Sequence, residues 1–261
     1  MTDEQSPLLT ERVGHVLVLT LNRPQARNAM NLELAGLLGQ AVEELTDTPE
    51  LRAAVLTGAG TAFCAGQDLK ALVAGEALFP SEHPEWGFGA FVGHFTPKPI
   101  VAAIHGFAFG GGLELALACD LIVAAEGTAL GLPEVTRGLF AAGGGVGRIS
   151  QQLPEKIANR LLLTGEPITA EEALRWGLVN EVVPEAQVLQ TAIDLATRIA
   201  ENSPASIRVT KRLTAALAHT STWTDEYWMP VYDEVPAMFA SPDGIEGATA
   251  FAQKRPPVWR S

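Results

Sequence analysis

From Leu8 to Val183 the chain contains short apolar runs of the kind that form buried strands. Residues Val13–Leu21 alternate in polarity and are rich in β-branched side chains, which predicts a strand. This strand is expected to form a hairpin with Leu8–Arg12 through a turn at Gly14-His15. Further strands are predicted at Arg52–Thr57, Pro99–Ile104, Asp120–Ala125 and Leu178–Val183.

Segments with helical periodicity lie between these strands, and the C-terminal part of the chain is predicted to be entirely helical. After Asn31, a predicted N-cap, apolar side chains recur every three or four residues from Leu34 to Leu45. The run Thr169–Glu172 has the pattern of a capping box. Later helices are predicted at Glu185–Asn202, Ser206–Ala218, Thr224–Phe239 and Asp243–Arg255. We therefore predict an α/β core over residues 1–200 and an all-helical region over residues 201–261.

The most informative stretch is His105–Glu134, whose pattern predicts a strand, a glycine loop, a helix and another strand. The triplet Gly110–Gly112 places bare backbone N–H groups at a helix start, where the helix dipole favours negative charge. Such a site suits an oxyanion that forms during a reaction, and Glu114 and Glu134 beside it suit acid–base work. The alternative is a tight turn whose glycines only let the helix and the strand pack closely.

Two other segments are irregular. The residues Glu76–Trp86 contain two prolines and scattered aromatic side chains, which predicts a mobile loop. The aromatic residues Trp86, Phe88 and Phe91 are interpreted either as ordinary core or as the lining of a substrate pocket. The run Gly138–Arg148 is predicted to be a second glycine-rich loop.

Composition and charge narrow the class of protein. With 261 residues, 47% of them hydrophobic, the chain can bury a core as one large domain, or as a domain with a small appendage. A net charge of −12 disfavours nucleic acid and anionic membranes as partners. No apolar run reaches the length of a membrane span, and the N-terminal residues lack the pattern of a secretory signal. Because the chain has only two cysteines, no disulfide framework is expected, and we predict a cytoplasmic protein.

Several familiar chemistries lack their motifs. The run Gly143–Arg148 continues into neither the lysine–hydroxyl pair of a P-loop nor the third glycine of a dinucleotide fingerprint. No serine lies in a G-x-S-x-G elbow, and the five histidines never have the spacing of metal ligands. What remains is the glutamate pair and two loops with free amides, the glycine triplet and the turn Ala65-Gly66-Gln67. Two amides from separate loops are what an oxyanion hole needs.

From about Leu9 to Trp259 the chain resembles the crotonase (enoyl-CoA hydratase/isomerase) superfamily. The resemblance rests on several segments in the order in which that family has them. They are LNRPQARNAMN (Leu21–Asn31), AFCAGQDLK (Ala62–Lys70), KPIVAAIHGFAFGGGLELALACDLIVA (Lys98–Ala124), GLPEVTRGLFAAGGGVGR (Gly131–Arg148) and AFAQKR (Ala250–Arg255).

The resemblance implies a fold, a substrate and a set of site residues. The fold would be an α/β spiral of repeated strand-strand-helix units with a C-terminal helical region for trimerisation, in a homotrimer or a dimer of trimers. The substrate would be an acyl-CoA thioester, with no metal and no cofactor beyond the coenzyme A of the substrate itself. By this resemblance the backbone N–H groups of Gln67 and Gly111 bind the thioester oxygen. The long side chain of Gln67 differs from the small residue that hydratases often have there.

Members that hydrate a 2-enoyl-CoA carry two glutamates at the positions of Glu114 and Glu134, and this chain has both. The resemblance implies that Glu114 deprotonates the water that adds to C3 and that Glu134 delivers the proton to C2. The roles exchange in the dehydrating direction. Trp86, Phe88 and Phe91 are the candidates for the acyl pocket. Coenzyme A binding is assigned to Arg23, Ala65, Gly66, Gln67, Lys70 and Lys254, with Lys254 reaching in from the C-terminal region.

Two alternatives to a general enoyl-CoA hydratase stay open. Several short segments, among them Glu171–Gly177 and Ile245–Trp259, look similar to carnitinyl-CoA dehydratases within the same family. A quaternary ammonium group would then need an aromatic or acidic pocket. The rival from another class is a non-catalytic binding protein with the crotonase fold. The negative charge and the intact glutamate pair both argue against that rival.

Overall fold

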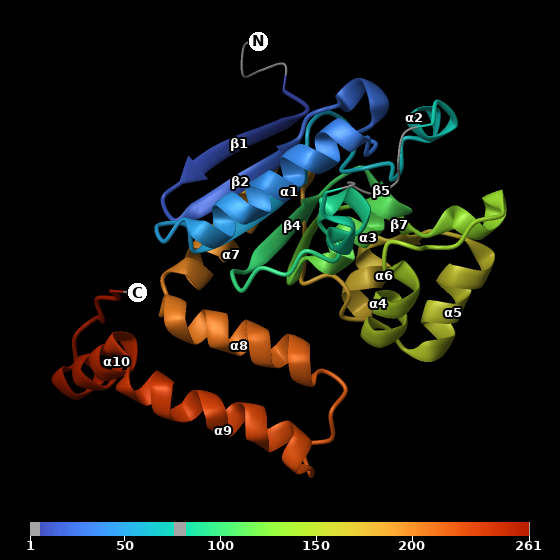
Figure 1. The fold of residues 1–261 in the computed structure, drawn as a ribbon. Coiled ribbons are helices and arrows are strands. Elements are labelled where there is room, and N and C mark those ends of the chain that lie inside the picture. Colours follow the sequence, from blue (N-terminus) through green and yellow to red (C-terminus); the bar gives the residue numbers. More distant parts are fainter. Residues whose placement is uncertain (1–5, 76–81, 261) are drawn as a thin grey trace.

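A computed structural model describes residues 6–75 and 82–260 (Figure 1). Its main sheet has six strands in the order β1-β2-β3-β4-β6-β9. The strands β1 and β2 form an antiparallel hairpin, and all later neighbours in this sheet are parallel. The bounds are β1 Leu8–Val13, β2 Val16–Leu21, β3 Ala53–Gly58, β4 Ile100–Ile104, β6 Leu121–Ala125 and β9 Glu181–Val183.

Both faces of the central strands β2, β3, β4 and β6 are buried, because side chains alternate along each strand and a helix layer covers each side. In β2, Val16 and Val18 face α7 (Val188–Ala200), together with valines and alanines of β3, β4 and β6. The residues between them, such as Leu17 and Leu19, face the opposite layer. That layer contains α1 (Leu32–Asp47) and α3 (Gly111–Ala118). The strands therefore read as continuous apolar runs in the sequence.

A second, three-stranded sheet has the order β5-β7-β8, with bounds β5 Phe107–Phe109, β7 Ala129–Gly131 and β8 Ile168–Thr169. The strand β4 pairs in parallel with β6, and β5 pairs in parallel with β7. Corresponding strands of successive strand-strand-helix units therefore pair in parallel with each other. This arrangement is the spiral that the resemblance implied. The sequence pattern alone had not predicted β5, because Phe107–Phe109 is short and ends at the glycine triplet.

The predicted helices and caps are present with small shifts of their ends. Asn31 accepts the Leu34 N–H at the start of α1, and Thr169 and Glu172 form the predicted capping box. Part of the segment predicted as a glycine-rich loop is helical, because α4 begins at Gly145. Other short helices are η2 Pro24–Ala26, α2 Leu69–Val73, η3 Pro84–Trp86, η4 Phe88–Ala90, η5 Pro133–Arg137, α4 Gly145–Gln152, α5 Glu155–Thr164, α6 Ala170–Arg175 and η6 Glu185–Gln187. Residues 76–81 of the predicted mobile loop lie outside the described residues.

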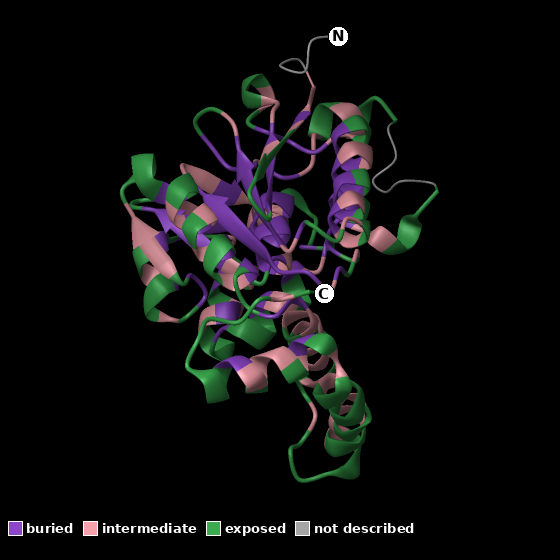
Figure 2. Cartoon of the chain, turned by 90° about the vertical axis from the view of Figure 1, so that its left-hand side faces the viewer, coloured by how far each residue is buried: buried purple, intermediate pink, exposed green. Residues whose placement is uncertain are grey.

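The chain ends in three helices that lie below the sheets in Figure 1: α8 Pro204–Leu217, α9 Asp225–Ala240 and α10 Pro242–Gln253. Figure 2 shows purple, buried segments concentrated in the sheet core, whereas these helices are mainly exposed or intermediate. None of the residues of α9 is buried. No helix in the described part of the chain has the length and apolar character needed to cross a membrane.

Candidate active site

Strand pairing brings together two loops that are far apart in the sequence. Cys64 and Ala108 form an isolated parallel bridge, in which Cys64 accepts a 3.1 Å backbone hydrogen bond from Phe109. Just beyond this bridge, one chain continues into Ala65-Gly66-Gln67 and the other into the glycine triplet. The two predicted oxyanion loops are adjacent because the strands that lead into them are paired.

The contact between these loops depends on Gly66, which has a φ of +91°. A Cβ atom at this position would lie 2.8 Å from the carbonyl oxygen of Phe109 and 2.9 Å from the nitrogen of Gly111. Only glycine tolerates both the positive φ and this close approach of two backbones. Within the described residues, neither the Gln67 N–H nor the Gly111 N–H donates to a protein acceptor. Both amides are therefore available to a ligand oxygen.

The turn that carries Gln67 is held by backbone bonds to the segment before α1. The Ala65 N–H donates to Arg27 at 3.0 Å, and the carbonyl oxygen of Gly66 accepts from Met30 at 2.7 Å. The Asp68 N–H in turn donates to Met30 at 2.9 Å. These bonds fix the direction of the Gln67 amide between them.

Each glycine of the triplet lies against a different wall of the site. A Cβ at Gly110 would be 3.0 Å from Glu134 Oε1, and a Cβ at Gly111 would be 2.3 Å from the tip of the Phe88 ring. A Cβ at Gly112 would be 2.2 Å from the carbonyl oxygen of Cys64. The triplet therefore allows a carboxylate, an aromatic ring and a neighbouring backbone to converge on one helix start.

Glu114 lies in the first turn of α3 and is only 3% exposed. Its Oε1 accepts a 2.8 Å hydrogen bond from the Gly145 N–H at the start of α4. The backbone of Gly143 approaches the other oxygen, since a Cβ there would lie 2.5 Å from Glu114 Oε2. The second glycine-rich segment thus holds the Glu114 carboxyl group, a role that its sequence did not indicate.

Glu134 lies in η5, and its Oε1 approaches Gly110 of the triplet. Its Oε2 is buried and has no hydrogen-bond partner among the described residues. A buried carboxyl oxygen without a partner is costly for the fold, and it is suited to meeting a substrate. The structure therefore brings Glu114 and Glu134 to the same glycine triplet.

Burial raises the pKa of Glu114 from 4.5 to about 7, and the nearby Glu134 adds to this rise. The amides of Gly145 and Gly143 and the Arg148 guanidinium oppose it, because they favour the ionised carboxylate. Burial also raises the pKa of Glu134. Both carboxyl groups therefore hold a proton more tightly than a carboxyl group in water does.

The raised pKa of Glu114 has a consequence for stability. The folded state holds this proton more tightly than the unfolded state, so the stabilisation is fully present below about pH 4.5 and is lost as the pH rises to about 7. A shift of this size corresponds to roughly 3 kcal/mol. Glu114→Gln cannot ionise, and we expect it to gain up to about this amount relative to wild type between acidic and mildly alkaline pH.

Urea unfolding of both proteins at about pH 5 and about pH 8 would measure this gain. The exposed Glu126 offers a matched control, because Glu126→Gln keeps Glu114 and its stability should follow the pH dependence of wild type. A stability difference between Glu114→Gln and wild type that stays constant with pH would contradict the raised pKa.

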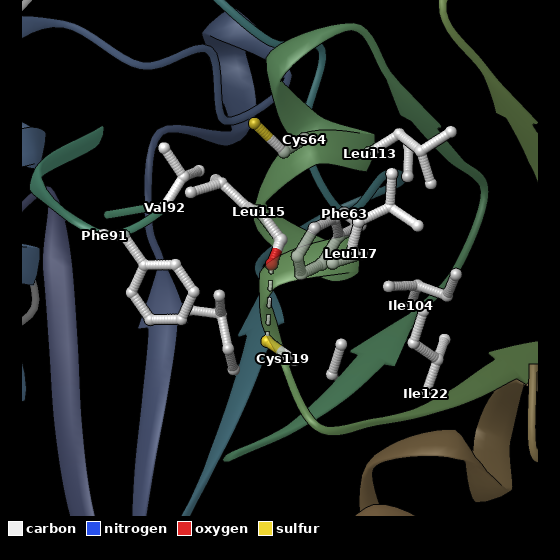
Figure 3. Packing of buried hydrophobic residues seen from close by; sticks show 14 of the residues in the cluster. Phe63, Cys64, Phe91, Val92, Ile104, Leu113, Leu115, Leu117, Cys119 and Ile122 are labelled. Atoms are coloured by element: carbon white, nitrogen blue, oxygen red, sulfur yellow. Dashed lines mark hydrogen bonds between the residues drawn. The ribbon is translucent and has the colours of Figure 1, made fainter. Parts of the chain in front are cut away.

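The three aromatic candidates for the acyl pocket have different positions. Phe88 is the one that touches the site, with its ring against Gly111. Phe91 is buried in the hydrophobic core, and Figure 3 shows it among the packed residues of the cluster around Leu115. Trp86 packs against α1, where a Cβ at Gly39 would lie 2.8 Å from its ring. Of the three, only Phe88 has the contacts of a pocket residue.

The predicted coenzyme A contacts are also spread apart. The Arg23 guanidinium pairs with Asp68 at 3.0 Å and donates to the carbonyl oxygen of Ala29, so it braces the turn at Gln67. Lys70 is exposed at the start of α2 beside that turn. Lys254, the C-cap of α10, belongs to the opposite end of the molecule from α2 (Figure 1). Within one chain, Lys70 and Lys254 are therefore not brought together.

Asn28 supports the site, although the sequence pattern does not single it out. Asn28 is fully buried with a φ of +55°, and its side-chain amide donates 2.8 Å bonds to the carbonyl oxygens of Ala59 and Ala62. Its side-chain oxygen accepts from the Arg23 N–H, and its own carbonyl accepts from the Cys64 thiol. Asn28 thus joins the segment before α1 to the strand that leads into the oxyanion loop. A buried polar residue inside the quoted motif was the available signal.

In the part of the chain that the structure describes, no group of three or more histidine, cysteine, aspartate or glutamate side chains could hold a metal ion. Both cysteine thiols are buried, and burial raises the pKa of Cys64 to about 12. The acid–base groups at the triplet are the two glutamates.

Comparison with known proteins agrees with this geometry. A family model described as enoyl-CoA hydratase/isomerase matches residues 11–261. Carnitinyl-CoA dehydratase from Salmonella typhi is 40% identical over 256 residues, covering 95% of this chain and 96% of that protein. The enoyl-CoA hydratase structure from Mycobacterium marinum has a TM-score of 0.92 and 40% identity, covering 98% of this chain and 99% of that one.

A carnitinyl-CoA dehydratase structure from Mycobacterium avium is 49% identical with a TM-score of 0.79, covering 97% of this chain and 98% of that one. These names agree with the predicted hydro-lyase activity and with its carnitinyl alternative. The predicted fold class, an α/β crotonase spiral with C-terminal helices, is confirmed. The chain belongs to the enoyl-CoA hydratase/isomerase, or crotonase, family.

Proposed function

We propose that this protein catalyses the reversible addition of water across the C2=C3 double bond of a 2-enoyl-CoA thioester. The observation that carries the proposal is the convergence of Glu114, Glu134 and two unpaired backbone amides on the glycine triplet. Addition of water to an enoyl thioester needs a base for the water, an acid for C2 and donors for the developing enolate oxygen. The site contains one candidate for each of these roles.

The proposed reaction begins when the thioester oxygen accepts hydrogen bonds from the Gln67 and Gly111 N–H groups. These donors stabilise the negative charge that moves onto the oxygen as water attacks C3. Ionised Glu114 removes a proton from the water, while protonated Glu134 delivers a proton to C2. The Gly145 N–H and Arg148 favour the ionised form of Glu114 that hydration requires. In dehydration the same two groups act in the opposite sense.

A second candidate is the interconversion of carnitinyl-CoA and crotonobetainyl-CoA, which the names of the relatives favour. The structure limits one way to recognise a quaternary ammonium. The Trp86 indole is stacked between His83 and His94, with ring centroids 3.9 and 4.0 Å away. Two nearly parallel rings at these distances cannot share one face, so both faces of Trp86 are covered. An aromatic cage would therefore have to exclude Trp86.

Steady-state kinetics with matched substrates would test both candidates. We expect the purified protein to hydrate crotonyl-CoA, seen as loss of the enoyl-thioester absorbance, without an added metal or cofactor. Crotonobetainyl-CoA, which has the same chain with a trimethylammonium group, should be the poorer substrate if the general function is right. A kcat/KM at least ten times higher for crotonobetainyl-CoA would establish the carnitinyl function instead. Activity on neither substrate or on longer enoyl-CoA thioesters would overturn the proposal.

The assembly and the coenzyme A contacts belong to the same proposal. We infer a homotrimer or a dimer of trimers that forms through the C-terminal helices and works in the cytoplasm without a nucleic-acid or membrane partner. Support comes from the exposed apolar side chains of α9, which are Trp228, Met229, Tyr232, Val235 and Phe239. In such an assembly Lys254 of one subunit would join Lys70 and the backbone of residues 65–67 of another. Arg23 would act there mainly through Asp68.

A further inference from the structure

The Phe88 ring lies against the Gly111 side of the site. Phe88 is only 6% exposed. The tip of its ring faces Gly111, and a Cβ placed at Gly143 would lie 3.0 Å from the Phe88 Cβ. Gly143 in turn adjoins Glu114 Oε2. Phe88 therefore spans the space between one oxyanion amide and the segment that holds a catalytic carboxyl group.

This position limits where an acyl chain can go. With the thioester oxygen on the amides of Gln67 and Gly111, carbons C2 and C3 must lie within reach of Glu114 and Glu134. Glu134 closes the Gly110 side, and Phe88 closes the Gly111 side beside Glu114. Carbons beyond the reacting pair would therefore meet the Phe88 ring within a few bonds.

The backbone around Phe88 is strongly constrained. Gly87, Gly89 and Ala90 all have positive φ, at +68°, +66° and +52°, and the alanine is an unusual occupant of that region. A Cβ at Gly89 would be 3.1 Å from the Leu115 side chain. Such a backbone persists only where its surroundings hold it in place.

Side chains on both sides of this turn add to the constraint. On one side, the Trp86 indole packs on α1 between two histidines. On the other side, the Arg148 guanidinium donates to the carbonyl oxygen of Val92. Phe88 thus projects from a segment that has stabilising contacts on both sides.

We propose that Phe88 forms the end wall of the acyl pocket and restricts the substrate to short acyl groups. This inference rests on the proposed hydratase function and names its substrate class, short-chain 2-enoyl-CoA thioesters. An apolar pocket discriminates by roughly 10-fold to 200-fold for each methylene that it fails to accept. Removing the ring should release that discrimination.

The test compares Phe88→Ala and Phe88→Leu with wild type on 2-enoyl-CoA substrates of four and ten carbons. Wild type should have a much higher kcat/KM for the four-carbon substrate. Phe88→Ala should raise the ten-carbon to four-carbon ratio by about 10-fold or more, with Phe88→Leu in between. Phe91→Leu is the matched control and should leave the ratio unchanged. Phe91 belongs to the same buried cluster as Phe88, but it is not among the nearest atoms to a Cβ at Gly111.

Calorimetric binding of butyryl-CoA and decanoyl-CoA separates this inference from the proposed function, since neither saturated thioester can be hydrated. A shift toward decanoyl-CoA in the Phe88 variants would support the pocket wall even if no substrate were turned over. Equal selectivity in wild type and in folded Phe88→Leu, or a wild-type preference for the ten-carbon thioester, would overturn it. If Phe88→Ala does not fold, Phe88→Leu still decides the question.

Discussion

Glu114→Gln and Glu134→Gln are each expected to lower kcat for the hydration of crotonyl-CoA by about three orders of magnitude or more. A positioned general acid or base contributes roughly 10²-fold to 10⁴-fold, and here each glutamate would do one half of the proton transfer. Glutamine keeps the shape and the hydrogen-bonding oxygen that the Gly145 N–H needs, but it can neither accept nor deliver the proton. The loss should therefore appear in kcat more than in KM.

The same measurement on the double variant is informative, because groups that act as a unit are not additive. We expect the kcat of the double variant to be about that of the less active single variant. Glu126→Gln changes an exposed residue directly after β6 and should keep the wild-type kcat. Circular dichroism should show all these variants folded. Turnover within about 10-fold of wild type by either single variant would contradict the acid–base assignment.

Gly66→Ala is expected to lower kcat/KM by about 100-fold or more. The added methyl would meet two backbone atoms, the Phe109 oxygen at 2.8 Å and the Gly111 nitrogen at 2.9 Å, in a residue with a φ of +91°. Backbone cannot yield as a flexible side chain would, so the two oxyanion loops must move apart. Losing one donor of an oxyanion hole costs roughly 10²-fold to 10³-fold in rate.

The chain provides a matched control in Gly36→Ala, within α1. No atom lies within 4 Å of a Cβ at Gly36, and alanine favours the helix by about 1 kcal/mol over glycine. This variant should keep full activity and unfold at a slightly higher urea concentration. Gly66→Ala should lose activity in the range of urea where it is still folded. Full activity in Gly66→Ala would show that the contact between the two loops is not needed.

Much of the fold was predictable because local patterns and buried positions agree. The apolar run Ile100–Ile104 is a strand buried on both faces, and Asn31 is the helix cap that its position indicated. The short strand Phe107–Phe109 was not predictable, since three residues have too little periodicity to be recognised. The start of α4 at Gly145 was also missed, because glycines are poor helix formers. That start depends on its tertiary position beside Glu114.

The candidate site was also predictable only in part. Glu114, Glu134 and the two glycine loops could be selected from the sequence by chemistry and by resemblance to a family. Their convergence was implied by the resemblance alone. The residue pattern does not show it, because it depends on the pairing of Cys64 with Ala108 across more than forty residues. The role of Phe88 was likewise undecided, since a buried aromatic residue looks the same in a sequence whether it fills a core or closes a pocket. Its contact with Gly111 supports the proposal that it closes a pocket.

By itself, the sequence determined the classes of residue and the order of the elements. It contained the strands and helices, the glycines that permit close approach and the acidic groups that can move protons. Tertiary structure decided which of these groups meet and in which direction their pKa values shift. Glu114 is an ordinary carboxyl group in the sequence. In the fold, burial and the nearby Glu134 raise its pKa to about 7, against the opposing amides of Gly145 and Gly143. The physical reason is that desolvation and charge coupling depend on neighbours in space, which strand pairing sets and local sequence does not.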